Sequence, residues 1–201
     1  MPLTATALAE GLRRIAAHME TVAGELNALD GQIGDGDLGV TMTRGGRALQ
    51  ELLPKLPADV GMALMGCAQA MTKVSGSSYG TLLATGLMAA AKATRGRTEV
   101  PWAETGALLR AALEAMMTRG RASLGDKTVL DALDAAAGAA EGLSDPHDIL
   151  VAAANAVDAA MERMRPMQAR IGRARIFGER SAGLDDPGMR AFREVLLGLG
   201  A

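Results

Sequence analysis

The sequence predicts an all-α fold, in which eight helices form an antiparallel up-and-down bundle or barrel. Hydrophobic residues make up 49% of the chain and aromatic residues only 2%, so alanine, leucine and methionine must fill the interior. Alanine and leucine are strong helix formers, whereas a β-rich protein needs many more β-branched and aromatic residues. A chain of 201 residues is long enough for one well-filled core, and we expect a single domain over residues 1–201.

The opening helix has the clearest apolar pattern. Large apolar residues recur at alternating steps of four and three, which places them on one face of a helix. They are Leu8, Leu12, Ile15, Met19, Val22, Leu26 and Leu29. Thr4 or Thr6 is available to cap the start of this helix. Such a face packs against a neighbouring helix at a small crossing angle, as in helix bundles.

Seven further helical segments follow, with proline near most of their proposed ends, where its missing N–H does least harm. They cover residues 41–53, 59–74, 81–94, 102–119, 127–142, 147–164 and 187–197. Connections in an up-and-down arrangement alternate between the two ends, so the first, third, fifth and seventh share one end. These four have the unusual compositions, and they cover residues 30–39, 75–80, 120–127 and 171–188. Their convergence predicts a site at that end.

The overall charge and the single cysteine narrow the class of protein. A formal net charge of −2 creates no field that would attract nucleic acid or an anionic membrane. Cys67 lies in an apolar stretch and is interpreted as a small buried residue, which fits a reducing compartment. The first residues lack the pattern of a signal peptide, and the apolar run 84–93 is too short to span a bilayer. We therefore expect a cytoplasmic protein.

Three carboxylates gather within eight residues after the opening helix: Asp30, Asp35 and Asp37, with glycines between them. Glycine lets the backbone turn tightly and brings together side chains that a helix would hold apart. Clustered carboxylates repel one another unless a cation lies among them, and magnesium binds a few carboxylates and bridges to phosphates. An ordinary Asp-Gly turn is the alternative. A calcium-binding hand fits less well, because its middle ligand and its closing glutamate are missing.

Two further segments suit phosphate or nucleotide. Residues 75–81 combine serine, glycine and threonine at the start of an alanine-rich helix, where exposed N–H groups suit phosphate, although an ordinary capped turn fits as well. Residues 120–128 approach a Walker loop, but Asp126 intrudes and a helix precedes the loop, so we reject that interpretation. Asp126 is instead a candidate cap for the helix that follows, and the stretch can line a nucleotide.

Arginines concentrate in the last of the four segments, as Arg173, Arg175 and Arg180. Guanidinium groups fork onto phosphate oxygens, and Asp186-Pro187 is a typical capped helix start. Exposed arginines are common without any function, so this segment gains its weight from its predicted position near the carboxylates. The two histidines, His18 and His147, have no nucleophile or metal partner nearby in the sequence and are interpreted as surface or satisfied residues.

These four segments together resemble the nucleotide-binding subunit, or C-terminal domain, of dihydroxyacetone kinases, the DhaL type. The matching pieces are Asp30-x4-Asp35-x-Asp37, Ser75-Gly76 with Gly80-Thr81, Gly120-x4-Gly125-Asp126-Lys127-Thr128, and the stretch from Gly172-Arg173-Ala174 to Asp186-Pro187-Gly188. They occur in the same order and with compatible spacing over nearly the whole chain. The resemblance implies an eight-helix antiparallel barrel, one end of which binds ADP or ATP through two magnesium ions.

The resemblance also assigns roles to individual residues. Asp30, Asp35 and Asp37 match the metal ligands, and together with Arg173 they form the implied catalytic set. Residues matching nucleotide-contacting positions are Leu38, Gly39, Val40, Thr41, Ser75, Gly76, Gly120, Val129, Arg173, Asp186, Pro187 and Gly188. Leu38 stands where the family usually has histidine, which removes a polar contact near the phosphates. The 75–81 loop is also shorter than the glycine-rich loops of the family.

The implied reaction is phosphoryl transfer to dihydroxyacetone or a similar small ketose. In the family, a separate sugar-binding unit of the DhaK type holds the ketose on its own histidine, and the 201 residues contain no such unit. The short 75–81 loop favours exchangeable ATP over a held ADP that a phosphotransfer-system protein recharges. Two other hypotheses stay open: a non-enzymatic nucleotide-sensing subunit, and a structural helical module with a calcium-stabilised turn.

Overall fold

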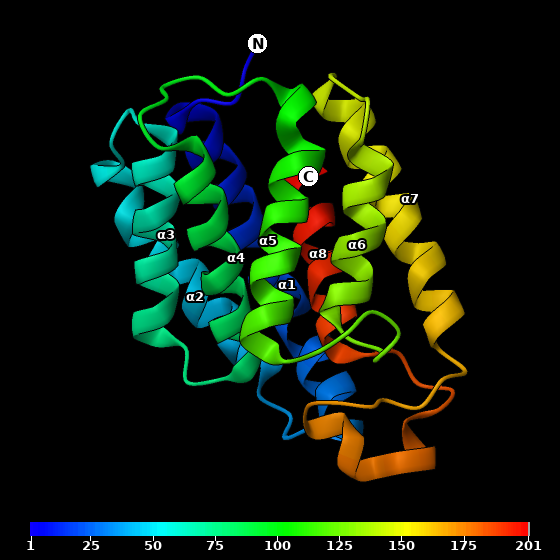
Figure 1. Ribbon diagram of the computed structural model, residues 1–201. Helices are drawn as coiled ribbons and strands as arrows, with labels where there is room; N and C mark the ends of the chain where they lie inside the picture. The colour runs from blue at the N-terminus through cyan, green and yellow to red at the C-terminus, as the bar shows by residue number, and fades with distance from the viewer. Residues whose placement is uncertain (201) are drawn as a thin grey trace.

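The computed structural model describes residues 1–200 and is predominantly helical (Figure 1). Its α-helices are α1 (Ala5–Ile33), α2 (Leu38–Leu52), α3 (Val60–Val74), α4 (Ser78–Thr94), α5 (Thr105–Gly120), α6 (Val129–Ala140), α7 (Pro146–Met164) and α8 (Pro187–Gly200). Three 3-10 segments complete the helical structure: η1 (Leu53–Lys55), η2 (Trp102–Glu104) and η3 (Arg173–Ser181). The only β pairing in residues 1–200 is one isolated bridge, Leu3 to Val100. The predicted all-α class is confirmed.

The helices form a closed ring. Each helix packs against the next along the chain, and α8 returns to pack against α1 (Figure 1). An apolar cavity of about 260 Å³ lies inside the ring, lined by side chains from every helix except α7. Helices α6 and α8 contact each other directly, so α7 packs on the outside of that junction. The antiparallel up-and-down barrel predicted from the sequence is therefore confirmed.

Small and flexible apolar side chains fill the core, as the composition requires. Cys67 is fully buried on α3, and burial raises the pKa of its thiol to about 11, which confirms its interpretation as a packing residue. Thr4 caps α1 by accepting a hydrogen bond from the Ala7 N–H. Across residues 1–200, no helix combines the length and the apolar character that a bilayer crossing requires.

Several helix boundaries differ from those predicted. Helix α1 continues past Asp30 to Ile33, whose side chain is 1% exposed and extends the apolar face by one more step. Asp30 therefore lies on a helix and not in the connection. Helix α2 begins at Leu38 and α4 at Ser78, each three residues earlier than predicted, because side chains outside each helix cap its first amides.

The start of α6 also differs. Helix α6 begins at Val129, and the residue that caps it is Thr128, not the predicted Asp126. The Thr128 hydroxyl accepts the Leu130 N–H, while Asp131 accepts the Thr128 N–H, which completes a capping box. The Asp126 carboxylate instead accepts the Ser123 N–H within the preceding turn.

The connections α1–α2, α3–α4, α5–α6 and α7–α8 meet at one end of the barrel, shown at the bottom of Figure 1. Residues from all four line the same pocket region, which confirms the predicted convergence. The α7–α8 connection, residues 165–186, is the longest of the four, and we call it the closing segment. It includes η3 and lies across this end, in orange in Figure 1.

Candidate functional site

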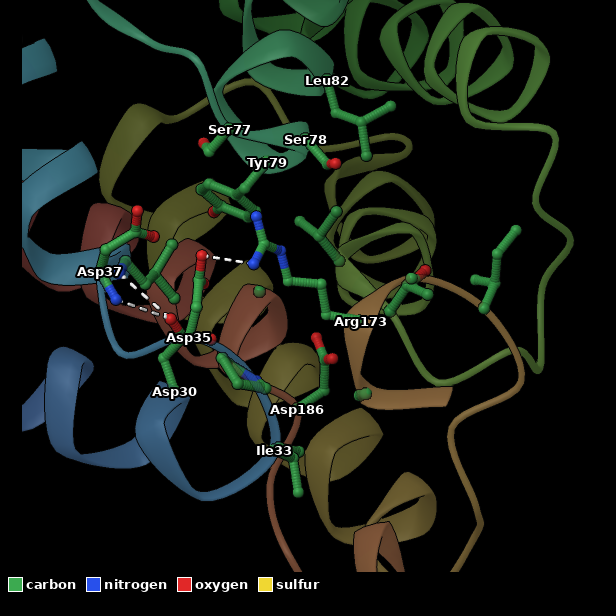
Figure 2. A pocket seen from close by; sticks show the side chains of 18 residues that line it. Asp30, Ile33, Asp35, Asp37, Ser77, Ser78, Tyr79, Leu82, Arg173 and Asp186 are labelled. Carbon is green, nitrogen blue, oxygen red and sulfur yellow. Dashed lines mark hydrogen bonds and ion pairs between the residues drawn. The ribbon is translucent and has the colours of Figure 1, made fainter. Parts of the chain in front are cut away.

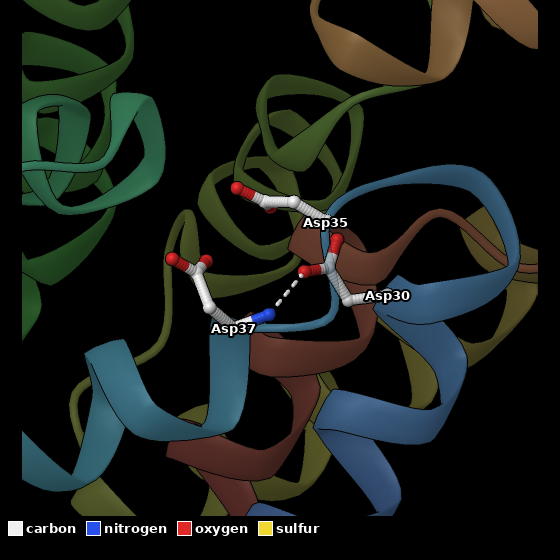
Figure 3. A group of neighbouring side chains, drawn as sticks. All are labelled: Asp30, Asp35 and Asp37. Carbon is white, nitrogen blue, oxygen red and sulfur yellow. Dashed lines mark hydrogen bonds between the residues drawn. The ribbon is translucent and has the colours of Figure 1, made fainter.

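The three predicted aspartates come together at this end of the barrel (Figure 3). One carboxylate oxygen from each of Asp30, Asp35 and Asp37 lies within 4.8 Å of the others. Asp30 is half-buried on the last turn of α1, whereas Asp35 and Asp37 are exposed in the connection to α2. The donor set consists of carboxylate oxygens alone, which fits a hard divalent cation such as Mg²⁺.

Asp30 joins the end of α1 to the start of α2. Its Oδ2 accepts the N–H groups of Asp37 at 3.0 Å and of Leu38 at 3.3 Å. Gly34 makes room for this carboxylate, because a Cβ at that position would overlap Asp30 Oδ1. Since Asp30 caps α2, the Asp37 side chain at the N-cap position makes no capping hydrogen bond. The Asp37 carboxylate is therefore available for another ligand.

A second side chain of α1 completes the cap of α2. Asn27 Oδ1 accepts the N–H groups of Gly39 at 2.7 Å and of Val40 at 3.3 Å. Only glycine allows this approach, because a Cβ at Gly39 would overlap the carbonyl oxygen of Ala23. The Thr41 N–H is bonded within the helix. The amides at the start of α2 are thus paired within the protein.

The electrostatics of this acidic corner favour a bound cation. Burial raises the pKa of Asp30, the amides of Asp37 and Leu38 lower it, and the nearby Asp35 carboxylate raises it further. Arg173 of η3 reaches across from the closing segment, and its Nη1 lies 2.5 Å from Asp35 Oδ2 (Figure 2). One guanidinium thus faces three carboxylates, which leaves the corner net negative.

The acidic corner is one wall of an open pocket (Figure 2). The other walls come from the start of α4, the start of α6, the closing segment and the start of α8: Ser77, Ser78, Tyr79, Leu82, Thr128, Val129, Ile171, Gly172, Arg173, Ala174, Asp186, Pro187 and Gly188. A second pocket adjoins it and shares Ser77, Leu82 and Gly172, among others. Together they form one groove, acidic at the first end and lined by Gly120, Ala122 and Leu130 at the other.

Asp186 and Tyr79 bring two further titratable groups to the groove. Asp186 Oδ1 accepts the Met189 N–H at 2.8 Å, so it caps α8 as predicted. Burial raises the pKa of Asp186 to about 7, against the opposing effects of that hydrogen bond and of the Lys127 ammonium. The Tyr79 hydroxyl is buried with no hydrogen-bond partner in residues 1–200, and burial raises its pKa. The phenol is therefore uncharged at neutral pH.

The chain also matches a known protein family. The model of the DAK2 domain family matches residues 32–201, which include two of the three aspartates and the whole closing segment. The chain belongs to the DAK2 domain family. The match covers most of the chain, and it agrees with the DhaL-type resemblance seen in the motifs.

Two individual relatives show which kinds of protein this DAK2 domain is similar to. It is 33% identical over 194 residues to the Escherichia coli K12 protein named PEP-dependent dihydroxyacetone kinase, ADP-binding subunit DhaL, covering 94% of this chain and 92% of that protein. It is 34% identical over 199 residues to human triokinase/FMN cyclase, covering 92% of this chain but 34% of that protein. The chain thus spans about a third of the triokinase and nearly all of the bacterial subunit.

A solved structure has the same fold. The dihydroxyacetone kinase of C. freundii in complex with AMP-PNP and Mg²⁺ superposes with a TM-score of 0.72 at 28% identity, covering 99% of this chain and 34% of that one. The native form of the same kinase gives a TM-score of 0.76 at 27% identity, covering 99% of this chain and 35% of that one. The DAK2 domain therefore corresponds to about a third of that kinase chain.

Most residues predicted for the site do meet at the groove of this DAK2 domain. Those that line it are Asp30, Asp35, Asp37, Leu38, Gly76, Gly120, Val129, Arg173, Asp186, Pro187 and Gly188. Gly39, Val40, Thr41 and Ser75 are not among the lining residues of either pocket. Ser75 shapes the loop instead, since its hydroxyl accepts the Ser77 N–H at 3.4 Å.

Sequence reasoning missed several groove residues, notably Ser77, Ser78, Tyr79 and Leu82 on the α4 side and Gly172 on the closing segment. The first three fall inside the 75–81 motif, and Gly172 begins the arginine-rich one, so the motifs marked the right segments without resolving the lining side chains. Tyr79 offered its own signal, because it is the chain's single tyrosine and lies inside a polar motif.

Proposed function

We propose that this DAK2 domain is the nucleotide-binding unit of a dihydroxyacetone kinase-type phosphotransferase, with residues 1–201 acting as one domain. It binds ADP or ATP with magnesium, and the terminal phosphate passes to dihydroxyacetone or a similar small ketose held by a DhaK-type partner subunit. The observation that carries the proposal is the cluster of Asp30, Asp35 and Asp37 at one end of a groove that also contains Arg173. A relative named as an ADP-binding subunit, and a structural neighbour in complex with AMP-PNP and Mg²⁺, support it.

Asp30, Asp35 and Asp37 are the residues that would hold two magnesium ions. Asp30 is fixed by its two amide hydrogen bonds, while Asp35 and Asp37 present exposed carboxylates to the groove. When bound, magnesium supplies the positive charge that neutralises polyphosphate oxygens during phosphoryl transfer. Because the bare carboxylates repel phosphate, nucleotide binding depends on the cation.

Arg173 acts on the phosphate side of the groove. Its side chain is 66% exposed and pairs with Asp35. If Arg173 leaves Asp35 when nucleotide binds, its guanidinium can donate two N–H groups to phosphate oxygens. The second pocket suits the base, because Leu82 and Ala122 present apolar surface and Gly120 carries no side chain to fill the space. The groove therefore has an acidic end for the cation and phosphates. The other end, proposed for the base, has a mixed lining in which apolar side chains lie beside hydroxyl groups and Arg119.

The group that removes the proton from the sugar hydroxyl belongs to the partner in this scheme. His18 lies away from the groove and pairs with Glu194 at 2.7 Å. His147 is exposed at the start of α7. Neither histidine lines the groove of the described chain, so this domain contributes positioning and charge neutralisation, which are the main needs of phosphoryl transfer.

Two features of the groove bear on which phosphoryl donor it uses. Residues 75–77 form a very short α3–α4 connection, and Leu38 adds no polar contact to the phosphates. Both features favour exchangeable ATP. The alternative is a held ADP that a phosphotransfer-system protein recharges, and it predicts that nucleotide stays bound through purification.

Calorimetry and coupled turnover test the proposal. Folded protein is titrated with ADP or ATP in the presence and absence of Mg²⁺, and ATP consumption is followed with a DhaK-type partner and several ketoses. We expect Mg²⁺-dependent nucleotide binding and ketose-dependent turnover. Asp35→Asn should abolish turnover at unchanged helical content, because it removes one carboxylate from the cation site.

Three outcomes would contradict parts of the proposal. Folded protein that takes up no nucleotide with Mg²⁺ would refute it entirely. Tight ADP retention without turnover, with partner and ketose present, would indicate a nucleotide-sensing subunit. Calcium selectivity over magnesium without nucleotide binding would indicate a structural turn. Native mass spectrometry of the purified protein separates exchangeable from retained nucleotide.

A further inference from the structure

Lys127 is a buried lysine that ties two distant connections together. It lies in the α5–α6 connection, is only 1% exposed, and directs its ammonium towards the closing segment. Its Nζ donates to the carbonyl oxygens of Arg165 at 3.0 Å, Met167 at 2.8 Å and Ser181 at 2.7 Å. Two acceptors lie near the start of the closing segment and one near its end. A single side chain therefore holds both ends of this segment.

This lysine is used as a donor of hydrogen bonds and not as one half of an ion pair. An ammonium has three N–H donors, and all three have a carbonyl partner here. Burial lowers the pKa of Lys127, while the carboxylates of Asp185 and Asp186 act in the opposite direction. The residue also adopts a φ of 62°, a left-handed conformation that a non-glycine residue keeps only where its surroundings fix it.

The closing segment that Lys127 holds carries groove residues between its tied ends. Ile171, Gly172 and Arg173 line the pocket, and Arg173 reaches the acidic corner (Figure 2). Fixing both ends of a loop removes most of its accessible conformations, so the cost of ordering it is met before any ligand binds. The position of Arg173 over the carboxylates therefore depends on how firmly the base of the segment is held.

We propose that Lys127 is a positioning residue that fastens the closing segment across the groove and so presents Arg173 to the phosphates of a bound nucleotide. The link to phosphate rests on the proposed function, whereas the fastening itself does not. Backbone contacts assist it: the Gly183 N–H donates to the Arg165 carbonyl at 2.8 Å, and the Arg170 N–H donates to the Asp126 carbonyl at 3.1 Å. Lys127 is the one side chain that bonds the start and the end of the segment together from outside it, within the described residues.

Hydrogen exchange of the protein without nucleotide tests the fastening. Lys127→Met keeps the apolar stem and removes the ammonium, and Lys92→Met makes the same change at an exposed lysine of α4. We expect exchange in residues 165–183 to be about tenfold faster in Lys127→Met, and unchanged in Lys92→Met. Circular dichroism confirms that both variants keep their helices. Wild-type exchange rates in this segment of folded Lys127→Met would overturn the proposal.

Measurements on the wild type keep the proposal falsifiable if Lys127→Met does not fold. The amides of Ala169 and Gly183 are bonded within the segment, so they should be protected without nucleotide. Exchange of these amides at the rate of an unstructured chain would overturn the fastening. Protection well above that rate would support it.

Nucleotide binding provides the functional readout. We expect Lys127→Met to weaken Mg²⁺-ADP binding about tenfold and to raise KM for ATP more than it lowers kcat, because the magnesium ligands are untouched. Unchanged affinity in folded Lys127→Met, with tight binding by the wild type, would refute the positioning role and leave the proposed function intact. A wild type that binds no nucleotide would refute the proposed function and leave the exchange result standing.

Discussion

The two sides of the groove are built in different ways. The acidic corner depends on neighbours in the chain, since Asn27 and Asp30 of α1 bond amides 7 to 13 residues further along. The closing segment depends on distant contacts, since Lys127 bonds carbonyl groups 38, 40 and 54 residues away. The local side carries the three aspartates and the distant side carries Arg173. The three carboxylates thus depend on contacts between neighbouring elements, and the position of the guanidinium depends on contacts that tie a long loop.

The largest expected effect tests whether Asp37, in the acidic corner, binds the cation or stabilises the fold. Asp37→Asn should weaken Mg²⁺-dependent ADP binding at least a thousandfold, roughly 4 kcal/mol, because its carboxylate faces the groove. The same change should leave the unfolding free energy nearly unaltered, because the side chain makes no capping hydrogen bond. Calorimetry and urea unfolding measure the two quantities. Asp148→Asn, on exposed α7 surface, is the control and should alter neither much. A large loss of stability in Asp37→Asn would make Asp37 part of the scaffold.

The second prediction concerns the scaffold itself. Gly39→Ala should lower the unfolding free energy by about 3 kcal/mol, because the added Cβ would collide with the Ala23 carbonyl and force α1 and α2 apart. Gly24→Ala on α1 is the matched control, since a Cβ there meets no atom within 4 Å. That control should stabilise the protein by up to about 1 kcal/mol through helix propensity. Equal effects of the two substitutions in urea titrations would show that the close approach is unimportant.

The contrast between the two sides of the groove also explains which features of the structure could be predicted from the sequence. Helical periodicity and turn residues depend on near neighbours, so three features could be predicted: the ring of helices, the end where the four connections meet, and the cluster of three aspartates. The cap of α2 could not, because Asn27 reads as an ordinary polar residue on a helix until α2 is placed beside it. Asn27 and Gly39 are 12 residues apart and lie on different helices, α1 and α2.

Longer-range contacts were beyond the sequence altogether. Lys127 stood in a recognised motif, yet nothing nearby indicated that its partners lie in residues 165–181. The motif resembles a Walker loop, in which a lysine binds phosphate, whereas Lys127 donates to backbone carbonyl groups. Its burial and its partners follow only from the way the α5–α6 and α7–α8 connections meet at the end of the barrel.

The third prediction uses pH to compare two helix starts of the same sequence type, Asp186-Pro187 and Asp145-Pro146. Burial raises the pKa of Asp186 from 3.8 to about 7, so the protonated carboxyl stabilises the fold. That contribution is complete below about pH 4 and is lost as the pH rises through 7. Asp186→Asn resembles the protonated acid at every pH. It should therefore be more stable than the wild type at pH 8, on the order of 2 kcal/mol, with a difference that vanishes towards pH 4.

The control for this pH experiment is Asp145→Asn. Asp145 is an exposed cap that accepts the N–H groups of His147 and Asp148. Its replacement should alter stability by no more than about 0.5 kcal/mol, because asparagine caps helices nearly as well as aspartate. Thermal unfolding at several pH values measures both pairs. A pH-independent difference in stability between Asp186→Asn and the wild type would show that burial does not raise the pKa of Asp186 in the folded protein.

The smallest expected effect tests whether charge alone holds the closing segment. Arg165 Nε lies 2.7 Å from Asp185 Oδ1, and this ion pair joins the two ends of the segment as Lys127 does. The Arg165 side chain is 48% exposed, so water and salt screen the pair. Arg165→Gln should therefore cost about 0.5 kcal/mol or less and should raise hydrogen exchange in residues 165–183 far less than Lys127→Met does. Equal exchange in the two variants would mean that the exposed ion pair matters as much as the buried ammonium, and the distinction between them would be lost.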